Sequence, residues 1–185
     1  GKSAFSGCKA LREIEIPASV EEISIDAFHD CKSLKRVTFA KGSCLKSIDS
    51  EAFKNSSITE IEIPATVTTI ADNAFSGCVS LAEITLPEQI RIIGSSAFSG
   101  CSNLKEFVIP EKVEEIGKGS FSGCEGLIIY CKPTKKPAIY YDSSYSTYTF
   151  PLHSGLTIYV PRNRYNGYIQ YNGYTVGLEA SQDNW

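Results

Sequence analysis

The chain has 185 residues, of which 42% are hydrophobic, and it carries a formal net charge of −3 with a pI near 5.5. This length and apolar content suffice for one domain with its own core, whereas the acidic balance, without a basic stripe, excludes nucleic acid as an expected partner. Because no run of 18 apolar residues occurs, direct membrane insertion is not expected.

A phenylalanine recurs at spacings of 22 to 25 residues, at Phe5, Phe28, Phe53, Phe75, Phe98 and Phe121. The two most similar copies, residues 74–78 and 97–101, share the segment Ala-Phe-Ser-Gly-Cys and lie 23 residues apart. A period of this length predicts a solenoid, in which each unit buries its apolar face only against its neighbours. We therefore expect six units over residues 1–131, the first of them truncated, with the rings forming a ladder inside the coil.

Within each unit, the apolar positions outline two walls. In the fourth unit, Ile84 and Leu86 alternate with polar residues, as in a strand with one buried face, and Pro87 ends the strand because proline cannot donate to a sheet. The pair Ile90 and Ile93 follows, and we interpret it as the opposite wall. The Ala-Phe-Ser-Gly-Cys segment is predicted to be a tight helical or 3₁₀ corner. The pattern predicts a right-handed coil of the α/β repeat class with a short-stranded parallel sheet.

Two units depart from the common length. The second has two extra residues within 39–45, and the third has lost one within 53–58, where Ser56 replaces a cysteine. We expect surface turns to absorb these changes, since such turns tolerate insertions at small cost.

Five cysteines follow a ladder phenylalanine by three residues, and they are Cys8, Cys31, Cys78, Cys101 and Cys124. Stacked equivalents point the same way, whereas a disulfide needs two Cβ atoms that face each other. We expect these five to be reduced and buried. The positions of Cys44 and Cys131 outside this column leave their redox state open.

The order Ala-Phe-x-x-Cys, Leu, Ile-x-Ile-Pro, Val-x-x-Ile resembles the BspA-type leucine-rich repeats found in surface proteins of host-associated bacteria and in some protists. The resemblance covers residues 1 to about 131, and its departures are Ser56 and the absence of a proline after Phe39. It implies a leucine-rich-repeat solenoid that is extracellular or on the cell surface, and that recognises proteins or glycans of a host or neighbouring cell without catalysis.

The composition changes in residues 132–185, since all ten tyrosines lie at or beyond Tyr130. Residues 129–133 and 156–161 are predicted to be two more strands, followed either by a helix from Arg162 or by hairpins at the two Asn-Gly pairs. We interpret this region as a degenerate terminal repeat and a tyrosine-rich cap, as the resemblance implies. Four tyrosines of its long loop are candidates for exposure or for ligand contact: Tyr140, Tyr141, Tyr145 and Tyr148.

The outward side of the predicted sheet carries an acidic strip. Alternation places its residues in two columns, one with Glu13, Arg36, Glu60, Glu83 and Glu106, the other with Glu15, Thr38, Glu62 and Thr85. Three interpretations remain: a solvated face, a recognition face of the kind that solenoids present, and a calcium site, which the absence of an Asp/Gly-rich loop disfavours.

No catalytic residue, metal site or cofactor is expected. The chain has two histidines; His29 could lie one coil from Ser6, but an exposed corner offers no oxyanion hole, and His153 has no second histidine or cysteine pair nearby in sequence. The sequence therefore predicts a non-catalytic recognition module for an extracellular protein or glycan, with a monomer favoured. The alternative is a structural spacer that holds another domain away from the envelope.

Overall fold

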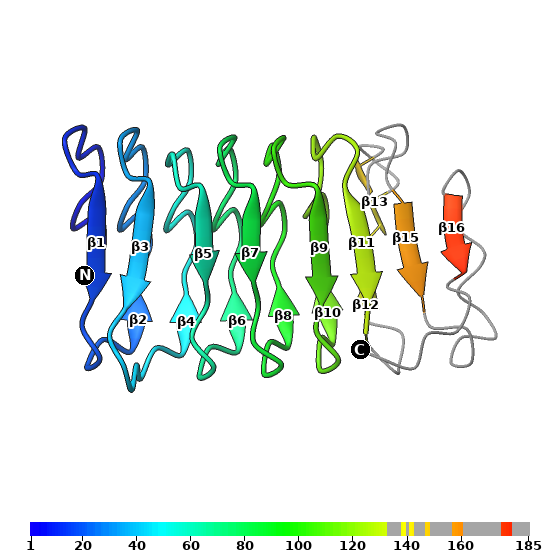
Figure 1. Cartoon of the computed structure of the whole chain (residues 1–185), viewed down its shortest axis with the longest axis horizontal. Helices are drawn as coiled ribbons and strands as arrows, with labels where there is room; N and C mark the ends of the chain where they lie inside the picture. Colours follow the sequence, from blue (N-terminus) through cyan, green and yellow to red (C-terminus); the bar gives the residue numbers. More distant parts are fainter. Residues whose placement is uncertain (133–137, 140, 143–146, 149–156, 161–174, 179–185) are drawn as a thin grey trace.

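The computed structural model describes residues 1–132 in full and, beyond them, the backbone of five short strands at 138–139, 141–142, 147–148, 157–160 and 175–178. The chain coils into a parallel β-solenoid of the leucine-rich-repeat type, with coils stacked side by side along one axis (Figure 1). None of the described residues forms a helix, so none forms a helix of the length and apolar character that a membrane crossing needs.

The main wall is built from the longer strand of each unit. It consists of two four-stranded parallel sheets that lie next to each other. The strands of the first are β1 (Glu13–Ile16), β3 (Arg36–Phe39), β5 (Glu60–Glu62) and β7 (Glu83–Thr85). Those of the second are β9 (Glu106–Ile109), β11 (Ile128–Cys131), β15 (Thr157–Val160) and β16 (Thr175–Leu178).

The second wall lies behind the main wall and uses two-residue strands in a single six-stranded parallel sheet (Figure 1). Its strands are β2 (Glu22–Ile23), β4 (Ser47–Ile48), β6 (Thr69–Ile70), β8 (Ile92–Ile93), β10 (Glu115–Ile116) and β12 (Ala138–Ile139). In each of the first five, the second residue is a buried isoleucine, and the residue before it is half-buried or exposed. The predicted opposite wall is therefore confirmed.

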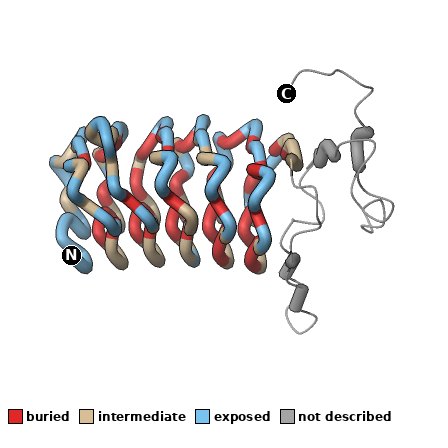
Figure 2. Tube along the Cα trace, turned by 90° about the horizontal axis from the view of Figure 1, so that it is seen from below, coloured by how far each residue is buried: buried red, intermediate tan, exposed pale blue. Residues whose placement is uncertain are grey.

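The interior between the walls holds the predicted ladder. Successive ladder rings from Phe5 to Phe121 stack with centroids 5.1 to 5.8 Å apart. Phe107 of β9 adds a ring that packs edge-on against Phe98 and Phe121. Burial is complete for Phe53 to Phe121, whereas Phe5 of the first described coil is 39% exposed. Figure 2 shows that the coil at the N-terminal end is mostly exposed and that buried residues recur in the coils after it.

The corners that carry the ladder phenylalanines are not helical, so that part of the sequence prediction is wrong. In the fourth unit, Asn73 and Gly77 flank the ladder residue and have left-handed φ of 57° and 71°. The Ser76 amide donates to the Asn73 carbonyl of its own coil, whereas the Phe75 amide donates to Ala97 of the next coil, at 2.8 Å. A 3₁₀ helix would use its amides within its own turn. The corner instead alternates, which lets every second amide join neighbouring coils.

The ladder cysteines add a further bond between coils. All seven cysteines are free, and the Cys78 thiol donates to the Phe53 carbonyl oxygen of the preceding coil at 3.0 Å. The same bond links Cys31 to Phe5, Cys101 to Phe75 and Cys124 to Phe98. The prediction of reduced, buried thiols is confirmed for these four residues, whereas Cys8 is only half-buried. Their role as donors was not foreseen from the sequence.

Neighbouring coils approach each other so closely at Gly94 and Gly117 that only glycine fits there. A Cβ atom on Gly94 would lie 2.5 Å from the backbone of Ala71 and Asp72, and one on Gly117 would lie 2.3 Å from the Ser95 nitrogen. Real Cβ atoms do not approach so closely, so a side chain at either position would force the coils apart.

After Cys131, the described strands extend both walls, so the predicted C-terminal cap has no support among the described residues. β12 pairs with β10 in the second wall, and β15 and β16 extend the main wall in parallel. The predicted helix start near Arg162 and the two Asn-Gly pairs offered as hairpin turns lie outside the described residues. Among the described strands, one pair is antiparallel, β13 (Tyr141–Asp142) with β14 (Thr147–Tyr148), and it was not predicted.

Candidate functional site

The register of the main wall brings the acidic strip together as two columns. Arg36 lies between Glu13 and Glu60, and Glu60 is the direct neighbour of Glu83. In the second column Glu15 pairs with Thr38, and Glu62 pairs with Thr85. Glu106 occupies the first position of β9, beside β7. All these side chains are exposed except that of Thr38, which is half-buried.

The charges of the acidic strip have no ion-pair partner within the described part of the chain, although Arg36 stands between two carboxylates. Neighbouring strands of a sheet are about 4.8 Å apart, so the Glu60 and Glu83 carboxylates repel each other. The strip is therefore an uncompensated negative surface.

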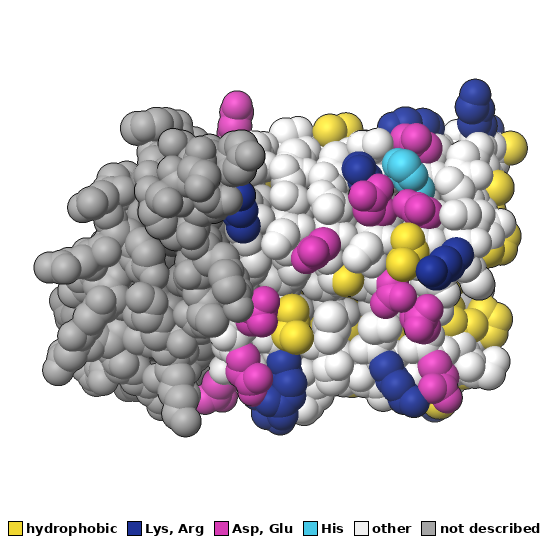
Figure 3. All heavy atoms as spheres, turned by 180° about the vertical axis from the view of Figure 1, so that it is seen from behind, with side chains coloured by type: hydrophobic (Ala, Val, Ile, Leu, Met, Phe, Trp, Pro, Cys, Tyr) yellow, Lys and Arg dark blue, Asp and Glu magenta, His cyan; other side chains and the backbone are white. Residues whose placement is uncertain are grey.

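On the second wall, two pairs of opposite charges join neighbouring coils. Lys46 Nζ lies 2.6 Å from Glu21 Oε2, and Arg91 contacts Glu114 one coil further along. Seen from behind, basic and acidic side chains lie next to each other in several places (Figure 3).

A groove of about 740 Å³ crosses the middle of the main wall over β3, β5 and β7. Six residues of the acidic strip line it: Arg36, Thr38, Glu60, Glu62, Glu83 and Thr85. Glu13, Glu15 and Glu106 lie outside it. The groove thus contains three carboxylates and one guanidinium, which is a setting suited to a cationic ligand.

One side of the groove is formed by the long turn of the second unit, the place where the sequence has two extra residues. Gly42 and Ser43 of this turn line the groove, and Gly42 has a left-handed φ of 79°. The Thr66 hydroxyl donates to the Ser43 carbonyl at 3.3 Å, which ties the turn to the next coil. The two extra residues are visible in the sequence. Their position beside the acidic columns is visible only in the structure.

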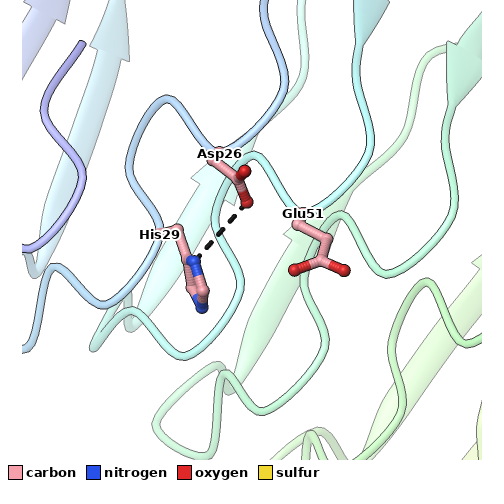
Figure 4. Close-up of side chains that lie close together, drawn as sticks. All are labelled: Asp26, His29 and Glu51. Atoms are coloured by element: carbon pink, nitrogen blue, oxygen red, sulfur yellow. Dashed lines mark ion pairs between the residues drawn. The ribbon is translucent and has the colours of Figure 1, made fainter. Parts of the chain in front are cut away.

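A second cluster lies at the corner of the second and third units (Figure 4). Asp26 Oδ1 is 3.5 Å from His29 Nδ1, and one ligand atom from each of Asp26, His29 and Glu51 lies within 4.8 Å of the others. All three residues are half-buried. Sequence reasoning considered His29 with Ser6 and missed this group, although Asp26 and Glu51 each precede a ladder phenylalanine by two residues.

The profile described as the BspA type leucine rich repeat region matches residues 1–128 with six copies. The chain belongs to the BspA-type leucine-rich repeat family. Such a solenoid is typically a non-enzymatic binding scaffold, and the comparisons point to no catalytic family. A comparison with curated proteins found no match.

Solved structures of other leucine-rich repeat proteins resemble this BspA-type chain. One from Bacteroides ovatus is 30% identical, with 89% of this chain and 53% of that chain covered and a TM-score of 0.59. A leucine rich cell surface protein from Faecalibacterium prausnitzii is 34% identical over 75% of this chain and 44% of that chain, with a TM-score of 0.55. A third, from Eubacterium ventriosum, is 27% identical over 79% and 37%, with a TM-score of 0.53. The chain thus spans about half of each solved protein or less.

The thiols of this BspA-type coil are held in their protonated form. Burial raises the pKa of Cys78 and of Cys124 to about 11, and it raises the pKa of Cys101 and Cys31 as well. The thiolate is the nucleophilic form of cysteine, so these side chains are inert packing groups at neutral pH.

The remaining candidates from the sequence fall in the tail. Tyr141 and Tyr148 are paired residues in the backbone register of β13 and β14. Tyr140, Tyr145 and His153 lie outside the described residues.

Proposed function

We propose that this BspA-type solenoid is a non-catalytic recognition module of the cell surface, which binds a protein partner through the groove on its main wall. The partner presents basic side chains on an extended segment. The observation that carries the proposal is the set of unpaired carboxylates of Glu60, Glu62 and Glu83 in the groove.

The chemistry of the groove supports a basic protein segment over a glycan. A lysine or arginine held between Glu60 and Glu83 would make charge-assisted hydrogen bonds and would remove the repulsion between them. Arg36 at the edge of the groove would reject a partner that is basic throughout, because like charges in contact are costly. A neutral glycan would gain nothing from the charge of the strip.

The family and one solved relative support the proposed location. The Faecalibacterium prausnitzii structure is named a leucine rich cell surface protein, and it covers 75% of this chain. The rest of the relative's length has no counterpart here, so the proposal concerns this module alone.

The test uses two immobilised extended peptides that differ only in two positions, arginine in one and glutamate in the other. The unmodified chain is expected to bind the arginine peptide, and more weakly as salt is added. The double variant Glu60→Lys with Glu62→Lys should lose this binding. A matched control, Glu22→Lys with Glu115→Lys on the second wall, makes the same change in net charge and should retain it.

The outcomes separate the alternatives. Equal loss in both double variants would show that only net charge matters, and the groove would not be the site. Glycan-array binding that both variants preserve would replace the protein partner with a glycan. Tolerance of charge reversal on either wall, without any binding to lose, would favour the structural spacer.

A further inference from the structure

The corner cluster of Asp26, His29 and Glu51 is separate from the groove and lies where the fold stacks equivalent positions. Asp26 and Glu51 both stand two residues before a ladder phenylalanine, and their backbone amides donate to Ser50 and Asp72 of the following coils. The coils therefore fix the backbone under both carboxylates. The close-up shows the three side chains projecting from two adjacent corners to the same side (Figure 4).

The distances suit a small divalent ion. Tetrahedral zinc sites have metal–ligand bonds of about 2.0 to 2.2 Å, which places two ligand atoms roughly 3.3 Å apart. Asp26 Oδ1 and His29 Nδ1 are already 3.5 Å apart, and Glu51 lies within 4.8 Å of both.

The other nitrogen of the imidazole supplies an independent indication. His29 Nε2 lies 3.6 Å from Asp30 Oδ2, and Asp30 Oδ1 is held by Lys32 Nζ at 3.0 Å. Metal-binding histidines usually turn their second nitrogen toward a carboxylate, which orients the ring and leaves the first nitrogen for the metal. Asp30 lies on this second side of His29 at ion-pair distance, beyond the reach of a hydrogen bond, while Asp26 lies near the first nitrogen.

We infer that Asp26, His29 and Glu51 form a binding site for a divalent transition metal of the zinc class, with a fourth position open to water. An imidazole nitrogen with two carboxylate oxygens suits zinc, whereas calcium takes six to eight oxygen ligands and magnesium keeps an oxygen octahedron. Two carboxylates also balance the charge of a divalent ion. The site joins two adjacent coils, because Asp26 and His29 belong to one coil and Glu51 belongs to the next.

One neighbour competes with the metal. Lys54 Nζ lies 2.9 Å from Glu51 Oε2. Lys54 follows Glu51 by three residues, as His29 follows Asp26. A metal ion must displace this ammonium group from Glu51. The strength of binding is therefore set partly by Lys54, and its removal should tighten binding without altering any ligand.

The experiment is a calorimetric titration of the EDTA-treated full chain with Zn²⁺. Saturable binding of one ion is expected, accompanied by a rise in Tm, since a ligand that binds only the folded state stabilises it. His29→Gln should lose this binding, and Lys54→Gln should strengthen it. Ca²⁺ and Mg²⁺ should produce no comparable signal.

Two controls address the other ligands that zinc could find. Cys44→Ser removes an exposed thiol, and His153→Gln removes the second histidine. Both should retain the site, and the near-ultraviolet spectrum with Co²⁺ should lack the charge-transfer band of a thiolate ligand. Binding that survives His29→Gln, or that disappears with Cys44→Ser, would overturn the inference. Unfolding curves of each variant exclude loss through misfolding.

Discussion

The two walls of the coil stack the same units over the same core, but they arrange charge in opposite ways. On the second wall, Glu21 pairs with Lys46 and Arg91 with Glu114 across coils. On the main wall, Glu60 and Glu83 stand in register as like charges without a cation between them. The stack can evidently pair charges from neighbouring units. The unpaired strip is therefore a consequence of residue choice, which favours a partner that supplies the missing cations.

The largest effect on stability is expected from removing a buried ladder ring, which lies between the two walls. Phe75→Ala should lower the free energy of unfolding by about 3 to 5 kcal/mol, because a fully buried aromatic side chain leaves a cavity. Urea unfolding followed by circular dichroism measures the loss. Phe5→Ala is the matched control, and it should cost less because Phe5 is 39% exposed. Equal losses would mean that the ladder is not what joins the walls.

A smaller effect is expected from alkaline pH. Burial raises the pKa of Cys78 to about 11 in the folded chain, against about 8.5 for a free thiol. Between these values the unfolded chain has released the proton and the folded chain has kept it, so stability falls as pH rises. The stabilisation is complete below pH about 8.5 and amounts to about 3 kcal/mol for such a thiol.

Comparing urea midpoints of the unmodified chain and Cys78→Ser across this pH range isolates the thiol from tyrosines and lysines. Serine already occupies the equivalent position at Ser56, which is buried and lies 3.4 Å from Cys78 Sγ. The variant should lose less stability on going to alkaline pH. An identical decline in both chains would assign the effect to other groups.

The smallest effects should have opposite signs on the two walls. Glu83→Gln removes a repulsion on the main wall and should stabilise the chain by roughly 0.2 to 1 kcal/mol, whereas Glu114→Gln breaks a pair and should destabilise it by no more than that. Thermal unfolding at low and high salt measures both, and salt should shrink both. Changes of the same sign would remove the contrast between the walls.

The spacing and alternation of apolar residues in the sequence predicted the parts of the fold that depend on burial. The spacing of the ladder phenylalanines placed each ring, and alternation such as Glu60-Ile61-Glu62 placed the main-wall strands, because each apolar residue has only one interior to enter. The thiols were correct for the same reason. The corners failed, since the sequence of Asn73 to Gly77 does not reveal that half of its amides bond to the next coil.

The candidate sites were predictable only in part. The columns that include Glu60 and Glu83 follow from period and alternation, so the strip was found. The groove was not, because it needs the long turn around Gly42 to stand beside β5. The corner cluster was also missed, since Glu51 reaches His29 only across the stack.

The sequence by itself determined that this protein is a stack of similar coils with aromatic rings inside and an acidic file outside, since both follow from a regular spacing of side chains. Only the tertiary structure decided how the coils join at their corners, where the surface is hollowed, and which charged groups from different coils meet. Those features depend on contacts between residues more than 20 positions apart, and the local pattern of residues carries no record of such distances.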